Sequence, residues 1–221
     1  MKKFFCLILA FAVSLGLFTG LGKTDATAST ATGETAESKF VAAPLAALEI
    51  NDEKSLAEID GEKVDAAIMS FTLTGEIADK DGNALQSAAE LATKLALKNI
   101  AMVYRIENSA ILEAFKAYYE ASGLKDAAVA SSSSAVLIAA AEIKNLNVYY
   151  IAEDISDRDL AAVAITQANA FGAQTIILEG ETNYDTVRYI QSRLKSVWIK
   201  TESDKICLLY TSPSPRDRTR S

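Results

Sequence analysis

The stretch NVYYIAEDISDRDLAAVAITQANAFGAQTIILEG, residues 147–180, holds one strand–helix–strand unit. Its two short runs, Asn147–Ala152 and Thr175–Leu178, are apolar on both faces, as parallel strands covered by helices must be. The stretch between them, Arg158–Phe171, has the length of a helix, and Asp157 is the type of residue that caps a helix N-terminus. The stretch therefore predicts a parallel βα unit.

The same alternation of short apolar runs and amphipathic stretches continues through the chain from Phe40 onward. Further strands are expected at Ala46–Ile50, Ala66–Phe71, Ile100–Arg105, Ala127–Ser131 and Val197–Lys200. Further helices are expected at about Gln86–Leu97, Ser109–Ala121, Ala135–Lys144 and Tyr184–Lys195. Asn183 suits an N-cap, and Gly123 and Gly172 suit helix stops. Strands recur about every 25 to 30 residues, the length of one βα unit. This single series predicts one α/β domain, as a doubly wound sheet or as a βα barrel.

Two of the expected helices carry apolar residues at helical spacing, which indicates one face packed against a sheet. These residues are Ile111, Leu112, Phe115 and Tyr119 in one helix, and Leu160, Val163, Ile165 and Ala168 in another. We expect both sets to be buried.

The first 28 residues have the features of a signal peptide. Lys2 and Lys3 precede a long apolar run, and Ala26-Thr27-Ala28 has the small-x-small pattern that a signal peptidase accepts. An extracytoplasmic location is therefore expected, secreted or at the cell surface. An uncleaved membrane anchor is the alternative, because the apolar run is long enough. The small polar residues that follow, 29–39, predict a flexible spacer.

The end of the chain, CLLYTSPSPRDRTRS, residues 207–221, is basic and has no apolar period. Read back through plausible codons, it resembles the end of a transposase-based sequencing-library adapter. We therefore expect residues 207–221 to be translated adapter and not native sequence. The native domain is then expected to span residues 40–206, with its last βα unit truncated. A disordered basic tail is the alternative.

The residue counts exclude several kinds of chemistry. The chain has no histidine, so Ser-His-Asp and Cys-His catalysis are excluded, and proton transfer would fall to carboxylates or lysines. Cys6 and Cys207 are the only cysteines and lie in the expected leader and tail, which leaves no disulfide framework and no usual zinc site. Without leader and tail, which hold six basic and two acidic residues, the net charge changes from −7 to −11. That charge disfavours nucleic acid and anionic membranes as partners.

Ligands of βα folds bind at the C-terminal ends of the strands. The candidate binding residues at the expected strand ends are Arg105, Glu107, Ser131, Ser132, Glu153, Glu179 and Lys200, with Ser133, Ser134, Asp154, Glu181 and Glu202 nearby. Convergent carboxylates and hydroxyls of this kind could hold a sugar, a polar head group or a calcium ion. The alternative is that charged residues stand there because the chain leaves the core at these points.

Three other features have both a functional and a structural interpretation. The run Ser131–Ser134 leads into a helix, so it could receive a phosphate oxygen or only cap the helix. Trp198, Tyr149 and Tyr150 could stack on a sugar or pack in the core. Residues Gly75–Gly82, GEIADKDG, lack the spacing of an EF-hand loop and predict a hairpin or turn.

Several segments, taken in order, resemble the glycerophosphodiester phosphodiesterase family, a phospholipase C-like barrel. DGNAL (81–85) with SAAEL (87–91) resembles its DG turn and "pTLeEvL" helix start, NIAMVYR (99–105) stands in place of its "nIEIK" strand, VASSS (129–133) resembles its "viiSSF" strand end, and VWIKT (197–201) its "vWTVN" strand. The resemblance covers about Val64 to Glu202 and is one of order and spacing. It implies a parallel (β/α) barrel of the TIM type, incomplete, with about seven βα units.

The chain lacks the residues on which that family's reaction depends. The HRG, PENT and HD motifs, which supply two histidines and an arginine, have no counterpart. The E-x-D metal pair would fall on Ala66–Phe71, AAIMSF, which has no carboxylate. If Arg105 takes the place of the family's lysine, Val103 stands where a metal-binding glutamate would be. We therefore expect no catalytic or metal-binding residue and no cofactor in this chain. Calcium or magnesium is expected only in an intact homologous domain.

The function expected from these features is that of an exported, non-catalytic barrel domain that accompanies an active phosphodiesterase domain in the full-length protein. The expected partners are a polar small molecule or glycerophosphodiester head group and a downstream domain of the same chain. No nucleic acid is expected, and no membrane beyond the signal peptide. Two alternatives are an extracytoplasmic solute-binding protein with a ligand between two lobes, and an active phosphodiester hydrolase. The single uninterrupted series disfavours the first, and the lack of histidine disfavours the second.

Overall fold

The computed structural model describes residues 46–59, 64–124, 127–193, 195–200 and 205–208. They belong to one compact unit of the chain, residues 36–221. They form an α/β fold with a mostly parallel central sheet. The expected signal peptide and spacer, residues 1–39, and residues 209–221 of the expected tail lie outside the described residues.

Strands and helices alternate along most of this part of the chain. The strands are β1 (Ala46–Ile50), β2 (Ala66–Phe71), β3 (Glu76–Ala78), β4 (Ala84–Ser87), β5 (Ala101–Arg105), β6 (Ala127–Ser131), β7 (Asn147–Glu153), β8 (Thr175–Glu179), β9 (Ser196–Lys200) and β10 (Lys205–Leu208). The helices are α1 (Glu53–Glu58), α2 (Ala88–Leu97), α3 (Ser109–Ser122), α4 (Ser134–Ala141), α5 (Arg158–Ala170) and α6 (Tyr184–Ser192).

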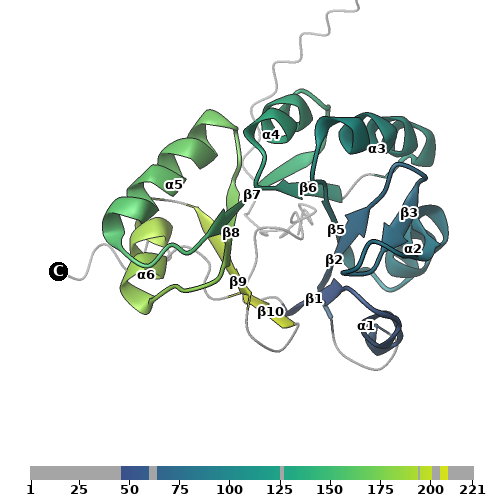
Figure 1. Cartoon of the computed structure of the whole chain (residues 1–221), viewed down its shortest axis with the longest axis horizontal. Helices are drawn as coiled ribbons and strands as arrows, with labels where there is room; N and C mark the ends of the chain where they lie inside the picture. The colour runs from purple at the N-terminus through teal and green to yellow at the C-terminus, as the bar shows by residue number, and fades with distance from the viewer. Residues whose placement is uncertain (1–45, 60–63, 125–126, 194, 201–204, 209–221) are drawn as a thin grey trace, which may run out of the picture. The chain divides into compact units, whose positions relative to one another are not determined.

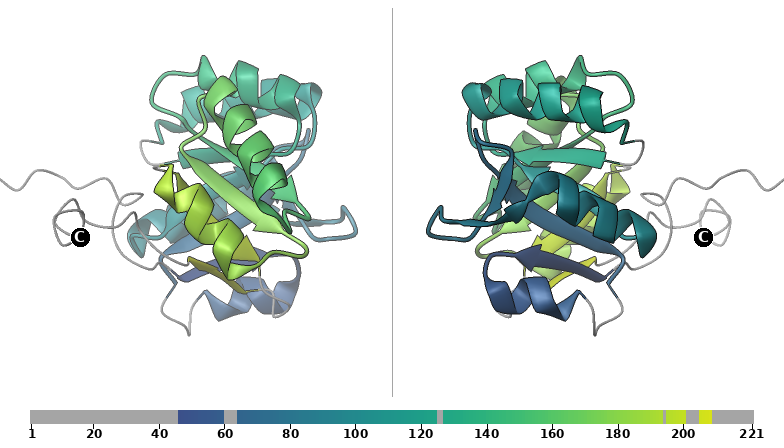
Figure 2. Two further views of the ribbon diagram at one scale, coloured as in Figure 1. Left: turned by 90° about the vertical axis from the view of Figure 1, so that its left-hand side faces the viewer. Right: turned by 90° about the vertical axis from the view of Figure 1, so that its right-hand side faces the viewer.

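The sheet is built from parallel neighbours. β1, β2, β5, β6, β7, β8 and β9 pair in this order, each parallel to the next. β10 is antiparallel to both of its neighbours, β9 and β1. The β3–β4 hairpin pairs in the antiparallel sense with the end of β2. The sheet curves, with the helices on its outer side (Figures 1 and 2). The C-terminal ends of the parallel strands therefore lie at one edge.

The two faces of the sheet carry separate apolar clusters. The larger cluster joins strand residues to helix residues such as Leu91, Phe115 and Ile190, so it fills the layer between sheet and helices. Every member of the smaller cluster lies on a strand, which places this cluster on the inner face. The inner cluster consists of Ala47, Ala66, Ile68, Ala101, Val103, Ala128, Ala130, Tyr149, Ile151, Ile177 and Trp198. Because both faces are apolar, alternation of polar and apolar residues is absent from these strands.

Large and small side chains divide the inner face between them. β1, β2, β5 and β6 contribute mainly alanines to the inner cluster, whereas β7 and β9 contribute Tyr149 and Trp198. The rings of these two residues meet edge to face, with centroids 5.4 Å apart, and each is 2 % exposed. The alanines leave the volume that the two rings occupy, as close packing requires. The structural interpretation of Tyr149 and Trp198 as packing residues is therefore confirmed.

A group of aromatic rings fixes α3 against the sheet. The Phe71 ring centroid lies 5.9 Å from that of Tyr104 and 5.4 Å from that of Phe115. The Tyr118 hydroxyl donates a hydrogen bond of 3.1 Å to the Ala88 carbonyl at the start of α2. Burial raises the pKa of the Tyr104 phenol, so its hydroxyl stays protonated in this layer. These contacts hold β2, β5 and two helices beside the β3–β4 hairpin.

The structure confirms the seven expected strands, with ends that differ by at most one residue. It also confirms Asp157 and Asn183 as N-caps whose side chains accept hydrogen bonds from the first turn. Gly123 has left-handed backbone angles just after α3, as expected for a helix stop. The segment Gly75–Gly82 forms β3 and the turn of the hairpin, as the sequence predicts.

Three expectations about the helices are wrong. Gln86 pairs with Ile77 in β4, so α2 begins only at Ala88. α4 ends at Ala141 and α6 at Ser192, three residues before the expected ends. Sequence reasoning also overlooked α1. This helix begins at a capping box in which Asp52 and Ser55 exchange hydrogen bonds. The expected domain boundary at residue 206 falls inside β10.

The expected apolar stripe of α5 is confirmed for Ile165 and Ala168, which are buried, and wrong for its other two residues. Leu160 is 42 % exposed and Val163 is 54 % exposed. The buried face is formed by Ala161, Ala164, Ile165 and Ala168. Helical spacing fits either face, because α5 is apolar around much of its circumference. The alanine face allows the helix backbone to approach the sheet more closely, so packing selects it. In α3 the expected stripe is buried, except that Ile111 is half-buried.

Among the glycines that the structure describes, Gly180 is the one at which a side chain would meet the closest contact. Its φ is +79°, and a Cβ there would collide with the Asp154 carboxylate. We predict that Gly180→Ala lowers the free energy of unfolding by about 2 kcal/mol. Gly82 has φ +85° with open space around it, so Gly82→Ala should cost only about 1 kcal/mol of backbone strain. Urea denaturation of both variants tests this order, and equal losses would contradict the collision.

Candidate functional site

Four charged side chains meet at the C-terminal ends of the parallel strands. Arg105, Glu179 and Lys200 are the last residues of β5, β8 and β9, and Glu49 is the penultimate residue of β1. The four strands are not all neighbours, since β6 and β7 separate β5 from β8. The side chains therefore reach one another over the end of the inner apolar cluster. We call these four residues the charged cluster.

Arg105 is the centre of the charged cluster. Its Nη1 lies 2.7 Å from Glu179 Oε1 and its Nη2 lies 3.1 Å from Glu179 Oε2, which is a two-pronged ion pair. The same Nη1 lies 3.4 Å from Glu49 Oε1. Lys200 Nζ lies 2.6 Å from Glu49 Oε2 and 3.9 Å from Glu179 Oε1. Each carboxylate thus faces both cations.

The charged cluster is partly shielded from water and has no net charge. The exposed fractions of the side chains are 11 % for Glu49, 15 % for Glu179, 26 % for Arg105 and 32 % for Lys200. Burial disfavours the charged form of Arg105, but the hydrogen bond to Glu179 and the charges of Glu179 and Glu49 outweigh it and raise its pKa. Two cations and two anions therefore compensate one another in a setting where a lone charge would be costly.

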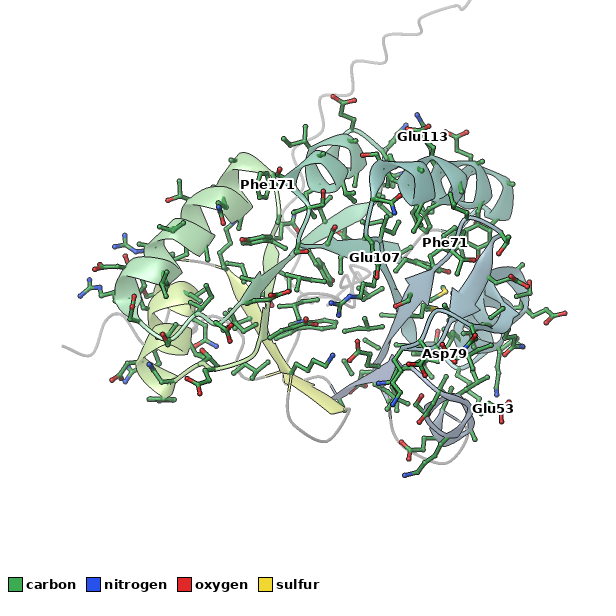
Figure 3. The ribbon with its side chains drawn as sticks, in the orientation of Figure 1. Glu53, Phe71, Asp79, Glu107, Glu113 and Phe171 are labelled. Carbon is green, nitrogen blue, oxygen red and sulfur yellow. The ribbon has the colours of Figure 1, made fainter. Side chains whose placement is uncertain are left out.

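A cavity of about 610 Å³ opens beside the charged cluster. Glu49, Arg105, Glu107 and Lys200 form its charged side. Its other side comes from the β2–β3 loop, the hairpin and α3, and includes Phe71, Thr72, Leu73, Thr74, Asp79, Lys80 and Ile111. In Figure 3, Glu107 lies near the centre of the view, with Phe71 and Asp79 toward the hairpin. The volume falls within the range of small-molecule sites.

The wall formed by the β2–β3 loop and the hairpin is held by its own hydrogen bonds. Thr72 Oγ1 accepts from the Glu76 amide at 3.1 Å, and Thr74 Oγ1 donates to Glu76 Oε2 at 2.7 Å. Asp79 Oδ1 accepts from the amides of Asp81 and Asn83, both at 2.8 Å. The hydrogen bond from the Asn83 side chain also lowers the pKa of Asp79. The carboxylates of this wall are thus engaged within the turn.

The structure brings together some of the sequence-predicted site residues. Arg105, Glu179 and Lys200 join in the charged cluster, and Glu107 lines the cavity. Glu153 is exposed at the end of β7 and Ser132 is exposed before α4, and neither lines this cavity. Of the residues nearby, Asp154 accepts from the Glu181 amide at 3.2 Å, and Glu202 lies outside the described residues.

Ser131 has a structural role. It is 2 % exposed, its Oγ donates to the Ile106 carbonyl at 2.6 Å, and the same atom accepts from the Ser133 amide at 3.1 Å. The hydroxyl therefore ties the end of β6 to the chain that follows β5. Both of its partners are backbone groups, so it is not positioned to receive a phosphate oxygen.

Glu49 is the residue of the charged cluster that sequence reasoning missed. It is the single charged residue in the run ALEI, one position before the end of β1. A carboxylate in a short apolar strand is a signal that it has a partner, since buried charges are paired. Its partners, Arg105 and Lys200, are 56 and 151 positions away in the sequence, so spacing alone could not identify them.

The described residues contain neither a metal-binding cluster nor a membrane-spanning helix. No group of three or more His, Cys, Asp or Glu side chains in these ranges could hold a metal ion. No helix in the described part of the chain is both long enough and apolar enough to cross a bilayer.

Comparisons of the chain with protein-family models, with curated proteins and with solved structures found no match.

The ion pair of Arg105 with Glu179 should be important for stability. We predict that Arg105→Gln and Glu179→Gln each lower the free energy of unfolding by about 2 kcal/mol, because each leaves a shielded charge with fewer partners. The double variant should lose less than the sum of the two. Lys116→Gln, at an exposed position on α3, is the control and should have no measurable effect. Denaturant unfolding measures all four, and strictly additive losses would show that the pair is not coupled.

Proposed function

We propose that this chain is a non-catalytic barrel domain, related in fold to the glycerophosphodiester phosphodiesterases, that binds a small polar ligand beside the charged cluster. The barrel part of the proposal is supported by the strand pairings, which continue from β9 to β10 and from β10 to β1. β10 would then take the eighth position, but in the antiparallel sense and with two residues of the expected tail, Cys207 and Leu208, in the strand. The resemblance in order and spacing between about Val64 and Glu202 supports the relationship.

The observation that carries the proposal is the cavity of about 610 Å³ with the charged cluster on one side. Such a cavity offers many donors and acceptors to the hydroxyls, phosphate or ammonium of a polar molecule. Glu49 and Glu179 are already ion-paired with Arg105 and Lys200. A carboxylate held in this way is poorly placed to accept a proton from a substrate or to activate a water molecule. Binding without turnover is the simpler use of this arrangement.

The donor set does not fit the divalent metal that the resemblance implies for active members of that family. Calcium and magnesium need several free oxygen ligands. Here each carboxylate of the charged cluster, Glu49 and Glu179, lies within 4 Å of the two cations Arg105 and Lys200, whose charges oppose a third cation. We therefore assign the site no metal and no metal-dependent step.

The ligand class we propose is a polar small molecule such as a glycerophosphodiester head group. Its phosphate would lie near Arg105 and Lys200, whose remaining donors border the cavity, and its hydroxyls near Glu107 and Thr72. Phe71, Leu73 and Ile111 give the opposite side apolar surface, against which a carbon chain could pack. In the full-length protein the domain would accompany an active phosphodiesterase domain outside the cell.

Ligand binding tests this proposal. Titration of the chain with glycerophosphocholine, followed by ¹H–¹⁵N NMR, should shift amides at the ends of β1, β5 and β9 and in the β2–β3 loop. Glu107→Gln should weaken binding about tenfold, the effect of one charge-assisted hydrogen bond. Glu113→Gln, a similarly exposed glutamate on α3 outside the cavity (Figure 3), should leave binding unchanged.

Two outcomes would contradict the proposal. Shifts absent from the strand ends at saturating ligand would remove the binding site. Release of glycerol phosphate in the presence of calcium or magnesium, abolished by Arg105→Gln but not by Lys116→Gln, would show that the domain is catalytic.

A further inference from the structure

A second group of polar side chains lies between α5 and α6, away from the charged cluster. Arg158 Cζ lies 4.6 Å from the ring centroid of Tyr189, and Arg193 Cζ lies 5.3 Å from the same centroid. Arg188 Cζ lies 5.6 Å from the ring centroid of Tyr184. Three of the four described arginines of the chain therefore gather over two tyrosine rings. We call these three arginines and two tyrosines the arginine–tyrosine group.

Four members of the group, Arg158, Tyr184, Arg188 and Tyr189, line a cavity of about 790 Å³. The two helices pack side by side, as Figures 1 and 2 show. The cavity is lined by Ser156, Asp157, Arg158, Asn183, Tyr184, Asp185, Thr186, Arg188, Tyr189 and Ser192. Arg193 follows directly after α6 and completes the group through its contact with Tyr189.

The guanidinium groups retain donors for an external ligand. Within the described residues, no ion pair joins Arg158, Arg188 or Arg193 to a carboxylate. Asp157, one of the two aspartates next to Arg158 in the chain, accepts from the amides of Asp159 and Leu160, both at 2.9 Å, to cap α5. A guanidinium stacked on a ring keeps its N–H groups at its rim, where they can meet a ligand.

The pKa of Tyr189 reflects the positive charge of the neighbouring arginines. Hydrogen bonding to Arg193 and Arg158 lowers the pKa of its phenol, because cations favour the phenolate. An anion placed between the same two guanidinium groups would be stabilised for the same reason. This local positive charge stands out on a chain whose formal net charge is −7.

We propose that the arginine–tyrosine group binds the phosphate group of a phosphate ester. Arg158 and Arg193 approach Tyr189 from different elements, so they offer two donor forks from two directions. A tetrahedral phosphate presents oxygens to both forks, whereas one fork alone satisfies a planar carboxylate. The hydroxyls of Ser156 and Ser192 line the same cavity and supply further donors. This inference does not rest on the proposed function of the other cavity.

Calorimetric titration of the full chain with inorganic phosphate and with glycerol 3-phosphate tests the proposal. Arg158→Gln and Arg193→Gln should each weaken binding at least about tenfold, since a charge-assisted hydrogen bond is lost. All three arginines are exposed, so the variants should keep their thermal unfolding midpoint. Lys116→Gln removes one positive charge at an exposed position on α3 and should not change the affinity. Equal losses in all three variants would mean only general charge attraction and would overturn the site.

Tyrosine absorbance provides a second measurement. A saturating phosphate ligand neutralises the two guanidinium groups, so the Tyr189 pKa should rise toward its ordinary value. Arg193→Gln should raise that pKa without any ligand, and Tyr189→Phe should remove the early titration step. A titration curve unaffected by phosphate would count against contact of the anion with this group.

The source of the phosphate group is decided by a third comparison. Binding of glycerol 3-phosphate together with sedimentation on phosphatidylglycerol vesicles would support the site and identify a lipid head group as its ligand. Binding of glycerol 3-phosphate alone would support a soluble ester. Sedimentation on vesicles without any affinity for the free ester would overturn a discrete phosphate site. Glu107→Gln lies in the other cavity, so it should leave unchanged the part of the phosphate affinity that Arg158→Gln and Arg193→Gln remove, and the two proposals can fail independently.

Discussion

The ion pair from Arg105 to Glu179 joins two strands that are not neighbours, β5 and β8. The two side chains therefore meet above the end of the inner apolar cluster, at the C-terminal ends of the strands. Together with Glu49 and Lys200, this ion pair forms a cluster that has no net charge and is partly shielded from water. Charges of one sign at this position would repel one another above an apolar interior, and the strand ends would separate. The position of the cavity depends on this compensation.

The inner cluster sets the geometry on which these charges depend. Alanines on β1, β2, β5 and β6 face Tyr149 and Trp198 on β7 and β9. The large rings fill the interior from one side, so the strands stay at a distance that the side chains of Arg105 and Glu179 can span. Packing of apolar volume and pairing of charge thus support each other at the same edge of the sheet.

The two candidate sites differ in how their charges are used. In the charged cluster every cation has a carboxylate partner, so a ligand must add hydrogen bonds to an arrangement that is already neutral. In the arginine–tyrosine group the cations rest on aromatic rings, which hold them in place without neutralising them. The charged cluster therefore suits a polar ligand that carries little net charge, and the arginine–tyrosine group suits an anion.

The sequence could predict much of this fold. Each parallel strand is a short run apolar on both faces, bounded by residues that end or begin helices, which explains why the expected strand ends agree within one residue. Where the sequence pattern fitted two different buried faces, it could not identify the correct one. α5 has apolar residues on most of its surface, and only packing against the sheet shows that Ala161 and Ala164 face inward rather than Leu160 and Val163. The predicted strand-end residues Arg105, Glu179 and Lys200 do meet, but Glu153 and Ser132 do not join them.

The sequence by itself determined the alternation of strands and helices, the caps at Asp157 and Asn183, and the absence of histidine chemistry. These features are local or compositional, so neighbouring residues are enough to specify them. Only the tertiary structure decided that Glu49 faces Arg105 and Lys200, that Ser131 is committed to the backbone, and that Arg158 and Arg193 share the ring of Tyr189. Each of these contacts joins distant parts of the chain or depends on which way a side chain points. The curvature of the sheet and the packing of helices on it determine both.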